Sequence, residues 1–207
     1  MKAGSSPPGT EEEIFEPEYS RDSDCGDIPE GEPNPQLDWS PCILRKGQIE
    51  ELVRHGFLPK NSNWKCPERE LFPTEDTHQM VVFKSFFEAG FGLPASDFCR
   101  RLLHYYGVEL QQLNPNSILQ IAIFVHLCEA YLGIDPHFQL FRYLFRMKVT
   151  SATHSRCVGR AGLQLRQGMK DLYIPYELKQ SVKEWYKEWF YVENQEPQLL
   201  GRSNMPP

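Results

Sequence analysis

The chain contains no pair of cysteines in C-x-x-C spacing, which zinc sites and thioredoxin-like motifs require. His154 and Cys157 lie three residues apart, but no second pair with ligand spacing accompanies them. We therefore predict no metal site and no disulfide framework. Cys99 and Cys128 fall among apolar residues of predicted helices, where we expect them to pack as small hydrophobic side chains. The other cysteines are spread along the chain, at Cys25, Cys42 and Cys66.

Sequence signatures of catalysis are also missing. The chain has no G-x-S-x-G element, no P-loop and no dinucleotide-binding fingerprint. A transposase or integrase needs three carboxylates that converge on two divalent metals, on a sheet whose strands alternate with helices. We therefore predict that the protein is not an enzyme and binds neither a cofactor nor a small-molecule substrate. The acidic residues of the central part occupy predicted caps, loops or a helix face: Asp97, Glu109, Glu129 and Asp135.

Signals for secretion and membrane insertion are absent as well. No basic segment followed by an apolar one opens the chain, as it would in a secretory signal peptide. The longest apolar stretch, residues 114–133, barely reaches the roughly 20 residues that a bilayer requires. Polar side chains at Gln120, His126 and Glu129 interrupt it. We therefore expect an intracellular protein that makes no use of a membrane.

Negative charge is concentrated at the start of the chain. The formal net charge is -6, but residues 1–38 hold 11 Asp or Glu against Lys2 and Arg21, a balance of -9. Residues 39–207 hold 20 basic and 17 acidic residues, a balance of +3. Because residues 1–38 contain few large apolar side chains, we predict a disordered acidic tail. The alternative is an acidic peptide, anchored by Ile14 and Phe15, that folds onto a partner.

The remaining sequence predicts one domain over residues 39–196 and a loose tail over residues 197–207. Its central element is a buried helix over residues 115–132. Asn114 can cap this helix with Pro115 at the first position, or Asn116 can cap it, and Gly133 suits the left-handed residue at the end. Its apolar stripe repeats at helical spacing through Ile118, Ile121, Ala122, Val125, Cys128 and Leu132.

Two amphipathic helices are expected to pack against the central one. Residues 95–106 have Ser96 as a cap, and residues 136–148 have Asp135 as a cap with Pro136 at the first helical position. A shorter helix is predicted over residues 46–55, and a last one after Ser181. The apolar positions of that last helix are Val182, Trp185, Tyr186 and Trp189.

Three segments favour strands. Residues 80–87 alternate at period two and then fit a helical turn, residues 158–168 resemble a glycine-flanked hairpin, and residues 189–192 follow the last helix as a strand. We predict that these segments form one small sheet. The fold class is therefore α+β, mostly helical.

Two stretches resemble a known family. The first is residues 90–145, GFGLPASDFCRRLLHYYGVELQQLNPNSILQIAIFVHLCEAYLGIDPHFQLFRYLF, and the second is residues 185–192, WYKEWFYV. They resemble the gypsy-type transposase domain found in retroelement-derived proteins of grasses, over about residues 40–195. The likeness is weaker at residues 158–168, where the family has a glycine-rich strand and this chain is rich in arginine. The resemblance implies descent from a gypsy-class long terminal repeat element of a plant genome.

Three interpretations of the sequence are open. The leading hypothesis is a non-enzymatic, gag-like structural domain that associates with itself or with a protein partner, favoured by the excess of aromatic residues. The alternative is nucleic-acid binding, because residues 136–170 hold seven Arg or Lys and no Asp or Glu. In the third interpretation Arg142 and Arg146 are only the solvated face of a helix that ends near Lys148. The candidate phosphate-binding residues are Arg156, Arg160, Arg166 and Lys170.

Overall fold

A computed structural model describes residues 39–74, 78–149, 158–176, 178 and 183–193. The predicted tails, residues 1–38 and 197–207, lie outside these described residues. The α+β fold class is confirmed. The elements in chain order are α2 (Lys46–Arg54), β1 (Trp64–Lys65), β2 (Gln79–Phe83), α3 (Lys84–Glu88), α4 (Asp97–Tyr106), η1 (Leu110–Gln112), α5 (Pro115–His126), η2 (Leu127–Leu132), α6 (Phe138–Leu144), β3 (Phe145–Val149), β4 (Ala161–Leu165), η3 (Trp185–Lys187) and β5 (Trp189–Glu193).

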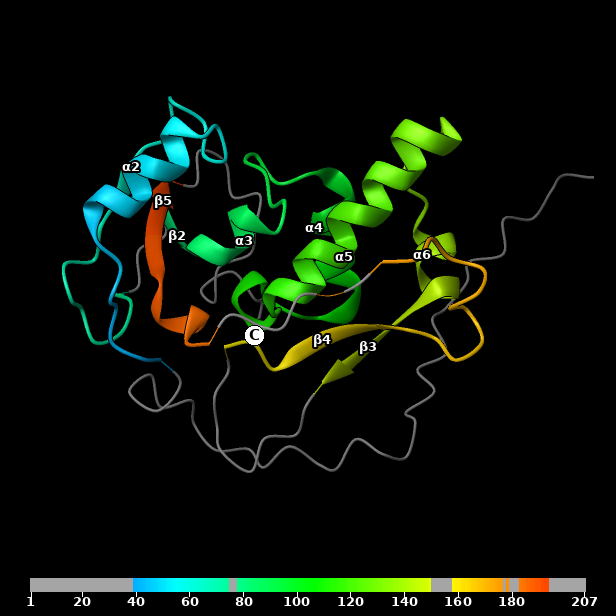
Figure 1. Ribbon diagram of the computed structural model, residues 1–207. Coiled ribbons are helices and arrows are strands. Elements are labelled where there is room, and N and C mark those ends of the chain that lie inside the picture. The colour runs from blue at the N-terminus through cyan, green and yellow to red at the C-terminus, as the bar shows by residue number, and fades with distance from the viewer. Residues whose placement is uncertain (1–38, 75–77, 150–157, 177, 179–182, 194–207) are drawn as a thin grey trace, which may run out of the picture.

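The central helix runs where it was expected, as α5 followed by the π-helical segment η2. The Asn114 side chain accepts a hydrogen bond from the backbone N–H of Ser117 at 2.9 Å, and Pro115 is the first helical residue. Gly133 ends the helix with φ of 62°. Figure 1 shows α5 beside β4 on one side and α3 on the other.

The far end of this helix is less buried than its sequence indicates. Leu132, predicted to lie on the apolar stripe, is 53% exposed, and Tyr131 is 76% exposed. The helix widens to π geometry from Leu127 onward, so the periodicity of an α-helix no longer describes which side chains face the core. Its last turns extend past the neighbouring elements in Figure 1.

Aromatic rings join α4, α5 and α6. The ring of Phe124 in α5 stacks on Phe98 of α4 with centroids 5.4 Å apart and meets Phe141 of α6 edge-on at 5.1 Å. Each such pair contributes about 0.5–1.5 kcal/mol beyond the burial of its area. Ser96 caps α4 by accepting from the N–H of Cys99, as predicted. The expected packing of the flanking helices on the central one is therefore present.

The prediction for residues 136–148 was wrong in length and in its cap. Helix α6 covers only Phe138–Leu144, and the His137 side chain, not Asp135, accepts from the backbone at its start. At Phe145 the backbone becomes extended, with φ of -116° and ψ of 155°, and β3 begins. Residues 145–149 alternate apolar and basic side chains, a period of two that suits a strand paired with β4.

The predicted single sheet is two sheets. A three-stranded antiparallel sheet has the order β1-β5-β2, which confirms the pairing of the segments at 80–87 and 189–192. The segment at 158–168 does not join it, because β4 pairs with β3 in a separate antiparallel ribbon. The predicted passage from strand to helix within 80–87 is confirmed by β2 and α3.

The predicted helix after Ser181 is also corrected. Ser181 and Val182 lie outside the described residues, and the described residues 183–188 contain the short turn η3 and no longer helix before β5. Trp189 starts that strand, fully buried, where its indole N–H donates to the carbonyl of Ser40 at 3.0 Å. Pairing across the sheet and burial of this indole therefore outweigh the local helical pattern.

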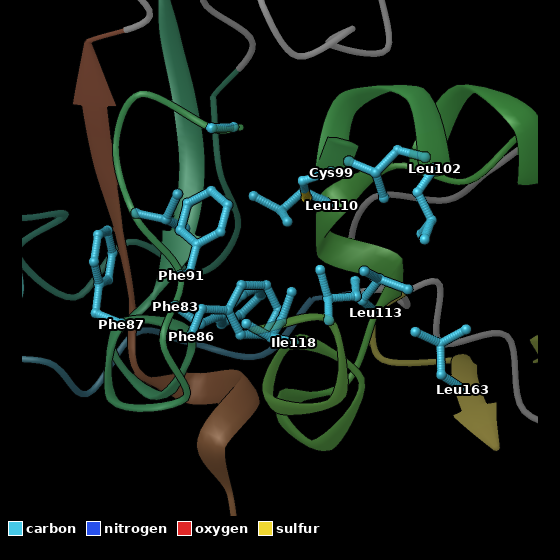
Figure 2. Packing of buried hydrophobic residues seen from close by; sticks show 14 of the residues in the cluster. Phe83, Phe86, Phe87, Phe91, Cys99, Leu102, Leu110, Leu113, Ile118 and Leu163 are labelled. Carbon is cyan, nitrogen blue, oxygen red and sulfur yellow. The ribbon is translucent and has the colours of Figure 1, made fainter. Parts of the chain in front are cut away.

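A hydrophobic core links the three-stranded sheet to the helices. Figure 2 shows Phe83, Phe86 and Phe91 directed toward Leu110 and Ile118. Cys99 and Cys128 are 5% and 0% exposed, which confirms that they pack as small hydrophobic side chains. The aromatic residues considered as an association surface are mostly in this core, among them Phe86, Phe87, Trp185 and Trp189.

None of the described helices combines the length and the apolar content that crossing a membrane requires.

Candidate nucleic-acid interface

The ribbon of β3 and β4 is fixed to α5 by its inner face. The Ser117 hydroxyl, fully buried, accepts a hydrogen bond from the N–H of Leu163 at 2.8 Å, and the Gln120 side-chain N–H donates to the carbonyl of Leu163 at 3.0 Å. At Gly162 the backbone passes so close to Asn114 that an added Cβ would meet its side-chain nitrogen at 3.1 Å. The central helix therefore positions β4 through two side chains on one turn.

The opposite face of the ribbon points outward and is basic. Strand geometry places alternate side chains on opposite faces, so that Phe145 is buried while Arg146 and Lys148 are exposed. In the antiparallel register Arg146 lies opposite Gln164 and Lys148 lies opposite Gly162. No carboxylate therefore faces either cation from the neighbouring strand.

Further cations lie next to the ribbon along the chain. Arg160 precedes β4 and is half-buried, while Arg166 and Lys170 follow β4 and are exposed. We call the outer face of β3 and β4, together with the basic residues that adjoin it, the basic face. Within the described residues its members are Arg142, Arg146, Lys148, Arg160, Arg166 and Lys170.

The cations of the basic face lack acidic partners within the part of the chain that the structure describes. Elsewhere on the domain lysines and arginines form ion pairs, for example Lys84 with Glu88 at 3.2 Å and Arg54 with Glu51 at 3.2 Å. None of the ion pairs among the described residues includes a member of the basic face. Its positive charge is therefore available to an anionic ligand.

Two arginines of the basic face have intramolecular roles. The Arg166 side chain donates through Nε to the carbonyl oxygen of Arg142 at 2.8 Å and to that of Phe145 at 3.2 Å. These bonds tie the chain after β4 to the point where α6 changes into β3. The guanidinium of Arg142 lies over the rings of Tyr105, at 4.7 Å, and Phe138, at 5.9 Å. Both arginines are therefore partly held by the domain itself.

The structure places three of the four residues that the sequence singled out. Arg160, Arg166 and Lys170 belong to the basic face, and Arg156 lies outside the described residues. The ribbon residues Arg146 and Lys148 were assigned to a solvated helix and were missed as site residues. The alternation of Phe145, Met147 and Val149 with these two cations is the signal that could have found them.

The remaining cavities and reactive groups offer little chemistry. A cavity of about 170 Å³ lies between α4, α5 and the loop before α4, with Phe91, Ile118 and Ile121 among its lining residues. Cys99 also lines it, and burial raises the pKa of this thiol to about 11, so it stays protonated at neutral pH. Among the described residues, no three His, Cys, Asp or Glu side chains are grouped to hold a metal ion.

These observations define a small α+β domain whose distinguishing surface is a basic face that has no acidic partner among the residues that the structure describes. A family model described as "Putative gypsy type transposon" matches residues 81–149, which are 69 of the 207 residues and run from β2 to the end of β3. The match confirms the resemblance to a gypsy-type transposon family over this segment and supports a retroelement-related protein, whereas the plant origin stays a prediction. No curated protein and no solved structure matches the chain.

Proposed function

We propose that the domain is a non-enzymatic interaction module of a retroelement-related protein, and that its basic face binds the phosphates of nucleic acid. The observation that carries this proposal is the ribbon of β3 and β4, on which Arg146 and Lys148 point outward without an acidic partner among the described residues. Lysine and arginine side chains that contact phosphates release condensed counterions, which favours binding to any sequence.

The way the ribbon is held supports this function. Its inner face is fixed to α5 through Ser117 and Gln120, so its two strands present the cations from a defined backbone. A two-stranded ribbon of this kind fits the major groove of a duplex or lies along a single strand. The cations contact phosphates in either arrangement, and no residue of the face is proposed to read base sequence.

The proposal is tested by a fluorescence anisotropy titration of the full chain with a labelled duplex and a labelled single strand. The affinity should fall steeply as salt rises, and the fall should be alike for unrelated sequences. No detectable binding at about 50 mM salt, where phosphate contacts are strongest, would contradict it.

Self-association is the second candidate, and the exposed end of the central helix favours it. Tyr131, Leu132 and Ile134 are 76%, 53% and 45% exposed, and the N–H of Ile134 donates to the carbonyl of Cys128 at 3.0 Å, which folds the chain back against the helix. Tyr131 and Leu132 belong to η2, which continues α5 into the projecting helical end seen in Figure 1, and Ile134 follows it. A second copy of this chain is the occupant that we propose for this end.

The expected association is weak. A stable interface buries about 800 Å² on each partner, and three side chains supply only part of that area. Light scattering after size-exclusion chromatography should show a mass that rises with concentration, and a Leu132→Gln variant should remain monomeric. If the measured mass of the wild type and of the variant rises with concentration in the same way, this end of the helix is not the interface.

A further inference from the structure

We propose that the acidic segment at residues 1–38 of this chain docks on the basic face and competes there with nucleic-acid phosphates. The competition rests on the proposed function, whereas the docking does not. The segment acts as an internal polyanion. The affinity of the chain for nucleic acid therefore depends on the acidic segment as well as on the basic face.

Charge complementarity selects the basic face as the docking site. Residues 1–38 carry a net charge of -9. Of the 20 basic and 17 acidic residues in 39–207, seven basic and no acidic ones lie within 136–170, which leaves 13 basic against 17 acidic residues for the rest. The rest of the domain is therefore net negative and repels the acidic segment. The stretch that contains the basic face is strongly positive and attracts it.

The absence of competing ion pairs strengthens this choice. A polyanion that docked near Lys84 or Arg54 would have to displace Glu88 or Glu51 from an existing pair. At Arg146 and Lys148 no described carboxylate needs to be displaced. The acidic segment therefore gains the full interaction with these two cations.

The segment is long enough to reach the basic face from its attachment point. Its last residue precedes Trp39, which is held by stacking on Phe83 at 6.0 Å and by an edge contact with Trp189 at 5.7 Å. A coil of 38 residues has an r.m.s. end-to-end distance of roughly 34 Å, and a fully extended one spans about 125 Å. A domain of this size has a radius of gyration of only about 15 Å. Every part of its surface is therefore within reach.

The covalent attachment of the acidic segment determines how strongly it can reduce the apparent affinity for nucleic acid. A segment attached to the same chain has an effective concentration of about 1 mM at a nearby site. If the segment binds the basic face with a Kd of about 0.1 mM, it would then reduce the apparent affinity for nucleic acid on the order of tenfold. The effect should fade above about 0.3 M salt, because charges on the surface are then screened within a few ångströms.

The first experiment compares three full-length proteins in anisotropy titrations with a labelled oligonucleotide. They are the wild type, a segment variant in which the five glutamates between residues 11 and 18 become glutamine, and a matched control with the same change of net charge. The control carries changes at exposed positions of the domain, Glu50→Gln, Glu51→Gln, Glu68→Gln, Glu129→Gln and Asp135→Asn. The segment variant should bind several-fold more tightly than the control at about 50 mM salt. Equal affinities for the two variants would overturn the competition.

The second experiment detects docking without nucleic acid. Carbodiimide joins carboxylates to lysine amines that lie in contact, so the wild type at low concentration should form a link between residues 1–38 and Lys148 or Lys170, read out by peptide mass spectrometry of the monomer. The link should weaken in the segment variant and at high salt. If the link forms but no protein binds the oligonucleotide, the docking stands and the proposed function fails. If all proteins bind alike and no link forms, the proposed function stands and the docking is overturned.

Discussion

Arg146 of β3 lies directly opposite Gln164 of β4 in the antiparallel register, with an uncharged side chain where an acidic partner would neutralise it. Opposite charges across a strand pair contribute roughly 0.2–1 kcal/mol, so the ribbon forgoes a small stabilisation at this position. Lys148 likewise has no acidic residue opposite it on β4, because its partner in the register is Gly162. This arrangement favours a ligand over internal pairing and is the basis of the functional proposal.

Replacing Phe124 by alanine should destabilise the domain by about 3–5 kcal/mol, because a fully buried ring that contacts Phe98 and Phe141 leaves a cavity. Tyr131→Ala, near the exposed end of the same helical path, is the matched control and should change stability by less than about 0.5 kcal/mol. Chemical denaturation of both variants measures the difference. Similar midpoints for the two would show that Phe124 does not hold the helices together.

Removing the Ser117 hydroxyl should loosen the ribbon. In Ser117→Ala the buried N–H of Leu163 loses its acceptor, at a cost of about 1–3 kcal/mol. Hydrogen exchange at the Leu163 amide should accelerate more than exchange at Val82, whose strand belongs to the other sheet. Equal acceleration at both amides would mean that the bond supports the whole fold and not the ribbon in particular.

Stability should fall as the pH rises from about 9 toward 11, in part because of Cys99. Burial raises the pKa of this thiol from 9.0 to about 11 in the folded protein, so the folded state binds the proton more tightly than the unfolded chain does. The contribution to the free energy of unfolding is complete below pH 9 and is lost as the pH passes through the folded-state pKa. Denaturation of wild type and Cys99→Ala over this range should give a shallower decline for the variant. If the stability of both proteins declines equally with pH, titrating groups other than Cys99 cause the decline.

Arg166 should matter for stability as well as for binding. Its Nε donates to the carbonyl oxygens of Arg142 and Phe145, so Arg166→Lys, which keeps the charge but loses the planar guanidinium, should destabilise the ribbon by about 1 kcal/mol or less. Lys170→Arg, the charge-preserving control on the same surface, should have no effect on thermal melting. If the two variants melt alike, the bonds of Arg166 contribute nothing measurable. This dual role makes Arg166 a poor choice for a binding test.

Local signals explain the parts of the fold that the sequence predicted. Asn114, Ser96 and Gly133 mark helix ends through their own side chain or backbone freedom, and each occupies the predicted position. Apolar periodicity identified only part of the buried face of α5: Ile118 and Ile121 are buried as predicted, but Ala122 and Val125 are only partly buried, and the fully buried Phe124 was not on the predicted stripe. Such features depend on neighbours within one or two turns.

The errors arose where distant residues decide the structure. Residues 145–148 satisfy a helical stripe when they are joined to Phe141 and Leu144, and only pairing with β4 makes them a strand. No local pattern gives that partner or its register, and the same misassignment hid Arg146 and Lys148 from the candidate site. The exposure of Leu132 was missed for a different reason, because a change to π-helical geometry is not visible in the apolar spacing.

The most direct test of the basic face uses Arg146→Gln/Lys148→Gln, which removes two outward cations of the ribbon and leaves Arg166 in place. A matched control, Lys60→Gln/Arg101→Gln, removes two exposed cations elsewhere and changes the net charge equally. The slope of log affinity against log salt on duplex DNA should shrink by up to about 1.8 for the ribbon variant and stay near the wild-type value for the control. Equal slopes for ribbon variant and control would contradict the assignment of the phosphate-binding surface to β3 and β4.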